Sequence, residues 1–153
     1  MNNNTEGLNE SEVAGARVTE IVGAPGVDCI LGILLAGWHY LNSEIIYTWW
    51  SEPKAMAVFG ILAFIGVCRY AGVVFRRPER SWSYSTRHFG FLIPWLFSVY
   101  LIVVGAYGLY FVSVFSFGLS ALLHSCVAIL VGLRLVRDTA KLSQLAENII
   151  ENR

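Results

Sequence analysis

The longest apolar tract in the chain runs from Phe89 to Val136 and contains a single charged residue, Arg134. As one α-helix this tract would be about 72 Å long, at about 1.5 Å per residue. The hydrocarbon core of a bilayer is about 30 Å thick, so the tract must cross it, turn and cross again. Two further apolar segments precede the tract. The pattern therefore predicts a protein that crosses a membrane four times.

We predict an all-α membrane protein, an antiparallel bundle of four transmembrane helices with an amphipathic C-terminal helix. A polar, acidic segment of residues 1–26 precedes the transmembrane domain of residues 27–136, and the amphipathic helix covers 137–153. The turn between the third and fourth helices is expected near residues 111–116. The four predicted helices cover residues of about 27–50, 55–75, 89–110 and 115–136.

Basic residues predict the orientation of this bundle. The connection 76–88 holds four arginines, and Arg134, Arg137 and Lys141 lie at the end of the fourth helix. With four crossings, both basic groups and both termini lie on one side, which the positive-inside rule makes cytoplasmic. The glycosylation sequon at Asn9 would then stay unmodified.

The tail beyond the fourth helix has apolar residues at helical spacing. They are Leu142, Leu145, Ala146, Ile149 and Ile150. This helix either lies on the membrane surface or against the bundle, or it binds a partner helix. Its nearly balanced charge disfavours binding to anionic lipid, which prefers a basic polar face. The expected partners are membrane lipid, other membrane-protein subunits and a second copy of the chain.

The composition excludes several classes of function. The chain is 56% hydrophobic and 14% charged, whereas soluble domains carry about 25% charged residues. No segment has the basic, aromatic-rich face that nucleic-acid binding needs. The three cysteines lack the spacing of a disulfide framework or a metal site. No phosphate-binding loop, nucleophile elbow or zinc-protease motif occurs, so nothing supports a hydrolase.

Small and polar residues form a stripe on two of the predicted helices. On the first helix, Asp28, Gly32, Ala36 and His39 lie within about 80° of one another, at about 100° per residue. Such stripes ordinarily let helices approach closely in lipid and form hydrogen bonds between them. We therefore treat these residues as helix-packing candidates. On the fourth helix the corresponding residues are Ser120, His124 and Ala128.

The two histidines, His39 and His124, are the strongest candidates for chemistry. Both are predicted near the bilayer centre, and an ionisable residue there is a functional hypothesis by default. They are neutral structural residues, members of a proton or ion relay, or the two axial ligands of a b-type haem. A zinc or copper site would need a further ligand, which the sequence does not offer.

Arg69 is the unusual residue of the second helix, because a charge there lies inside an apolar segment. Its long side chain either reaches toward the basic side of the membrane or forms an ion pair with Asp28. The second alternative requires a tilt between the helices, since the two residues differ by about 10 Å in height.

The leading hypothesis from these features is a non-enzymatic accessory or scaffold subunit of a membrane complex, without a cofactor. One alternative is an electron-transfer subunit that binds haem b through His39 and His124. Another is a small channel subunit that conducts ions or protons through its polar stripes upon oligomerisation.

Overall fold

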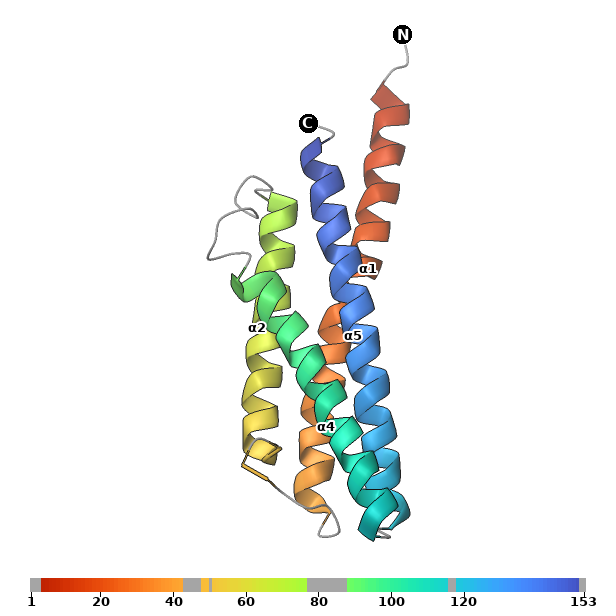
Figure 1. Cartoon of the computed structure of the whole chain (residues 1–153). Helices are drawn as coiled ribbons and strands as arrows, with labels where there is room; N and C mark the ends of the chain where they lie inside the picture. Colours follow the sequence, from red (N-terminus) through yellow and green to blue (C-terminus); the bar gives the residue numbers. More distant parts are fainter. Residues whose placement is uncertain (1–3, 43–47, 50, 77–87, 116–117, 152–153) are drawn as a thin grey trace.

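The computed structural model of the protein (Figure 1) describes residues 4–42, 48–49, 51–76, 88–115 and 118–151. In these ranges it describes all side chains except those of residues 4–22, 73–76, 146 and 149–151. Parts of two sequence predictions lie outside the described residues. They are the end of the first predicted helix and most of the connection 76–88.

Helices form the described part of the chain, and no strand occurs in it. The π-helical segment η2 ends two residues before Pro94, which cannot donate a hydrogen bond to the carbonyl of Gly90. A proline inside a helix disturbs the hydrogen bonding of the turn before it, and here that turn is π-helical. The elements are α1 (Asn4–Leu41), α2 (Pro53–Arg76), η2 (His88–Leu92), α4 (Ile93–Phe115) and α5 (Leu119–Glu151).

Four helical stretches are long and apolar enough to cross a membrane. This confirms the predicted all-α bundle and identifies a multi-pass membrane protein. Large apolar side chains are exposed along these stretches, among them Leu34, Ile65 and Leu130, as expected where helices face lipid. The four stretches are Gly23–Leu41, Pro53–Gly72, His88–Phe115 and Leu119–Leu145.

α1 and α5 extend well beyond their predicted bounds. α1 begins at Asn4 and continues through Pro25, so part of the segment predicted as polar and separate is helical. α5 continues to Glu151, so the structure has one helix where the sequence analysis places two. No glycine or proline occurs after Gly132, and nothing in the sequence therefore interrupts the helix at residue 136.

Neighbouring helices run in opposite directions, and α1 begins at the end of the bundle where α5 ends (Figure 1). The contacts between α1 and α5 follow this arrangement. Asp28 pairs with Arg134, and His39 contacts His124, so residue numbers rise on one helix as they fall on the other. This register decides which polar residues of the two helices meet.

α4 and α5 form the most extensive contact in the bundle, and glycines make it possible. A Cβ atom at Gly105 would lie 2.6 Å from the backbone oxygen of Ser125. A Cβ atom at Gly132 would lie 2.8 Å from the backbone oxygen of Ser98. Both distances are too short for carbon and oxygen, so each glycine lets the two backbones approach closely, as is usual between helices in lipid.

Candidate functional site

The buried carboxylate and imidazole side chains of the described structure lie on α1 and α5. They are Asp28 and His39 on α1, and His124 and Asp138 on α5, with no more than 3% of any of them exposed. We call the interface between α1 and α5 the polar seam. Buried ionisable residues in a membrane bundle are the first place to look for function, so the seam is the candidate site.

At the end of the seam nearer the termini, two buried carboxylates meet three basic side chains. A guanidinium nitrogen (Nη2) of Arg134 lies 3.3 Å from Oδ1 of Asp28. Oδ1 of Asp138 accepts a hydrogen bond of 2.9 Å from Nε of Arg137 and lies 3.9 Å from Nζ of Lys141. We call these five residues the charged cluster. Each carboxylate is thus compensated by at least one cation, as burial requires.

The ion pair of Asp28 differs from the one considered in the sequence analysis. Its partner is Arg134 on α5, whereas Arg69 on α2 is exposed. The pairing of Asp28 with Arg69 is therefore wrong. The physical reason is the register of the bundle, because α5 passes α1 with Arg134 at the height of Asp28, and no tilt is needed to bring them together.

At the other end of the seam, the two predicted histidines contact each other. The ring centroids of His39 and His124 are 4.7 Å apart, with the rings inclined by 60°. Nε2 of His124 lies 3.2 Å from the backbone oxygen of Leu35. A carbonyl can only accept a hydrogen bond, so Nε2 of His124 carries a proton and donates it across the interface.

Ser120 joins the same group of residues from α5. Its hydroxyl oxygen accepts hydrogen bonds from Nε1 of Trp38, at 3.2 Å, and from Nδ2 of Asn42. We call Trp38, His39, Asn42, Ser120 and His124 the histidine cluster. The hydrogen bonds from Trp38 and Asn42 to Ser120, and from His124 to the backbone of Leu35, join the end of α1 to the start of α5.

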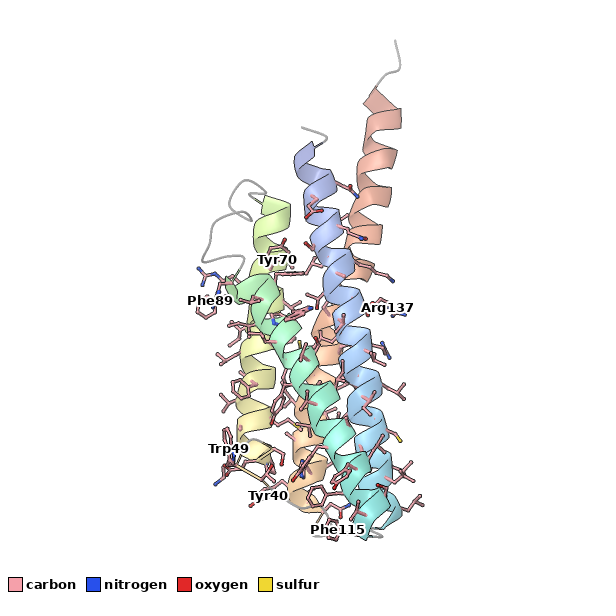
Figure 2. All side chains as sticks on the ribbon, viewed as in Figure 1. Tyr40, Trp49, Tyr70, Phe89, Phe115 and Arg137 are labelled. Atoms are coloured by element: carbon pink, nitrogen blue, oxygen red, sulfur yellow. The ribbon has the colours of Figure 1, made fainter. Side chains whose placement is uncertain are left out.

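The histidine cluster lies near one end of the bundle, and the predicted position at the bilayer centre is wrong. His39 is in the last turn of α1, which ends at Leu41. His124 is only about 7 Å along the axis from the start of α5. Exposed Tyr40 and Trp49 lie at this same end (Figure 2), where a membrane interface favours aromatic residues.

Apolar residues fill the seam between the two clusters. Ala36 and Leu35 on α1 and Ala128 on α5 are buried in the main apolar core. Gly32 accommodates an aromatic ring of α4, since a Cβ atom there would lie 2.7 Å from the ring of Phe97. The predicted packing residues thus lie at helix contacts, although Gly32 faces α4. A layer of apolar side chains separates the charged cluster from the histidine cluster.

The geometry of the histidine pair does not fit a haem. Two axial imidazoles must lie on opposite faces of a porphyrin, whose plane passes between them. His39 and His124 are instead in direct contact, with one ring edge toward the other. In the part of the chain that the structure describes, no three His, Cys, Asp or Glu residues come together in a way that could hold a metal ion.

The sequence analysis missed Asp138 as a seam residue. A signal was present, because Val131, Leu135, Asp138 and Leu142 recur at the spacing of one helix face, and all four are buried. Trp38 and Asn42 were missed for another reason. Their hydrogen-bond partner Ser120 is about 80 residues away in the chain, and only the fold brings them together.

Comparison with known proteins found no matching family model, no matching curated protein and no matching solved structure for this chain. A function is therefore inferred from the residues of the polar seam.

Proposed function

We propose that the protein is a non-enzymatic accessory or scaffold subunit of a membrane complex and needs no cofactor. One observation carries this proposal: polar contacts at both ends of the seam cross from α1 to α5. Asp28 is paired with Arg134, and His124 donates to the backbone of α1. Polar groups used in this way fix the register and pairing of two membrane helices.

The apolar layer in the seam supports this role over the conducting one. A path for protons or ions would need polar groups or water between the charged cluster and the histidine cluster. Leu35, Ala36, Ala128 and Val131 occupy that interval, and each is buried. A chain of hydrogen bonds does not pass through such side chains.

The outer parts of the bundle offer places for partner proteins. α1 and α5 both extend beyond their membrane-spanning stretches at the same end of the molecule (Figure 1). These extensions cover residues 4–22 and 146–151. Two helical arms on one side of a membrane can bind other subunits without disturbing the bundle. By the positive-inside rule this side is the cytoplasmic one.

Native electrophoresis of membranes solubilised in mild detergent tests the proposal. We expect wild-type protein to migrate in an assembly much larger than a single 153-residue chain in its micelle. Replacement of residues 146–153 by a Gly-Ser linker of equal length should release the bundle from that assembly. The matched control is Lys54→Gln at the opposite end, where the lysine is exposed, and this variant should stay in the assembly.

Two results would contradict the proposal. One is wild-type protein that migrates as a single chain at low detergent concentration. The other is an assembly that survives both the tail replacement and replacement of residues 4–22 by a linker of equal length.

A further inference from the structure

Three basic residues form a stripe on the outer face of α5, next to the buried carboxylates. We call Arg134, Arg137 and Lys141 the basic stripe. They are three and four residues apart, so they lie on the same face of the helix. Each side chain remains about half-exposed, at 52%, 61% and 54% in that order. Figure 2 shows Arg137 on the side of α5 that points away from the bundle.

The height of this stripe along α5 corresponds to a membrane interface. Counted from Leu119, Arg134 lies about 22 Å and Lys141 about 33 Å along the axis, at about 1.5 Å per residue. The hydrocarbon core is about 30 Å thick, so the stripe spans its boundary with the headgroups. Exposed Tyr40 and Phe115 lie at the other end of the bundle (Figure 2) and mark the opposite interface.

The charges of the cluster do not cancel. Three cations of the basic stripe face two carboxylates, Asp28 and Asp138, which leaves one positive charge. Both carboxylates are buried, so they hold the basic side chains from the side that faces the bundle. Arg137 uses Nε for Asp138, and its other guanidinium nitrogens remain for a ligand on the outer side.

We propose that the basic stripe binds the phosphodiester of an anionic phospholipid. One phosphodiester carries one negative charge, which neutralises the remaining charge of the cluster. Arginine binds phosphate oxygens through paired N–H groups, and basic clusters beside transmembrane helices bind anionic headgroups. The buried aspartates orient the arginines before the lipid arrives, which reduces the entropy lost on binding. This proposal concerns residues 134–141 and does not rest on the scaffold role.

The charge of the cluster can be changed in both directions, which makes the test specific. Lys141→Gln lowers the net charge from one to zero, and Arg137 still compensates Asp138. Asp138→Asn keeps the shape of the side chain and an oxygen that accepts the hydrogen bond from Nε of Arg137, so the arginine stays oriented while the net charge rises to two. The matched control is Lys54→Gln, which removes an exposed lysine at the opposite end of the bundle.

The experiment measures lipid binding to the purified full chain in neutral detergent by native mass spectrometry. The probes are phosphatidylglycerol, phosphatidylcholine, inorganic phosphate and a soluble acidic peptide. We expect wild-type protein to prefer phosphatidylglycerol over the other three. Lys141→Gln should weaken that binding about fivefold, Asp138→Asn should strengthen it about fivefold, and Lys54→Gln should leave it unchanged.

Other outcomes would overturn the proposal. Equal binding of both phospholipids, or an equal loss in Lys54→Gln, would mean that no specific headgroup site exists. Equal binding of inorganic phosphate would identify a phosphate site that is independent of lipid. Preferred binding of the acidic peptide would identify a protein-binding surface. Circular dichroism of each variant shows whether it is folded, and a misfolded Asp138→Asn leaves Lys141→Gln to decide.

Discussion

The ion pair between Asp28 and Arg134 allows a prediction in which the two partners are not equivalent. Asp28 is completely buried, whereas the Arg134 side chain is 52% exposed. Arg134→Gln leaves a buried carboxylate without its nearest cation. Asp28→Asn leaves an arginine that can turn toward water or headgroups. We therefore expect Arg134→Gln to destabilise the protein more than Asp28→Asn does.

The expected difference in unfolding free energy between the two variants depends on whether the charged side chain that remains is buried. Breaking a buried ion pair so that one charge stays buried costs about 3–5 kcal/mol. Arg137 also acts electrostatically on Asp28 and compensates it in part, so we expect about 3 kcal/mol for Arg134→Gln. Asp28→Asn loses a charge-assisted contact but leaves no buried charge without a cation, because Asp138 keeps Arg137, so about 1–2 kcal/mol is expected.

The assay is equilibrium unfolding in detergent, followed by circular dichroism. The double variant Asp28→Asn/Arg134→Gln should be no less stable than Asp28→Asn alone, because it contains no uncompensated carboxylate. Lys54→Gln serves as the control, since its contact with Glu52 is exposed and worth little. A loss of stability in Asp28→Asn that equals or exceeds the loss in Arg134→Gln would refute this prediction.

Three further predictions follow from other parts of the molecule. Gly132→Ala should be about 1–3 kcal/mol less stable than Gly37→Ala, because a Cβ atom meets backbone at the first site and nothing within 4 Å at the second; equal unfolding free energies would contradict this. Ser120→Ala should cost about 1–2 kcal/mol, since the indole of Trp38 loses the hydroxyl that accepts its hydrogen bond; unchanged unfolding would count against the cluster. Asn9 should carry no glycan when the chain is expressed in eukaryotic cells, and an endoglycosidase-sensitive shift in mobility would reverse the assigned orientation.

The number and nature of the helices could be predicted from the sequence because a bilayer imposes a length and an apolar composition. The ends of the helices were less predictable. α5 passes residue 136, where no residue disfavours a helix. α1 passes through Pro25 although a proline inside a helix loses one backbone hydrogen bond, which membrane helices tolerate when neighbouring helices surround them. The turn before α5 also lies slightly later than expected, because α4 continues to Phe115.

The site was predictable only in part. Helical periodicity placed Asp28 and His39 on one stripe of the first helix and His124 on a stripe of the fourth, and left open whether the two helices touch. The structure brings the two histidines together. The partner of Asp28 was not predictable in the same way. Its identity depends on the register between α1 and α5, which the close contacts and connections of the whole bundle determine. Periodicity describes one helix and contains no information about that register.

We propose that the polar seam holds α1 and α5 together and that its histidines perform no chemistry. Cross-linking of the double variant His39→Cys/His124→Cys in native membranes tests this most directly, after the three native cysteines are replaced by alanine. The account predicts a cross-link within one chain, formed by a short bifunctional thiol reagent, and a cross-linked protein that still migrates with the wild-type assembly. No cross-link within the chain, or a folded, cross-linked protein that is excluded from the assembly, would contradict the account.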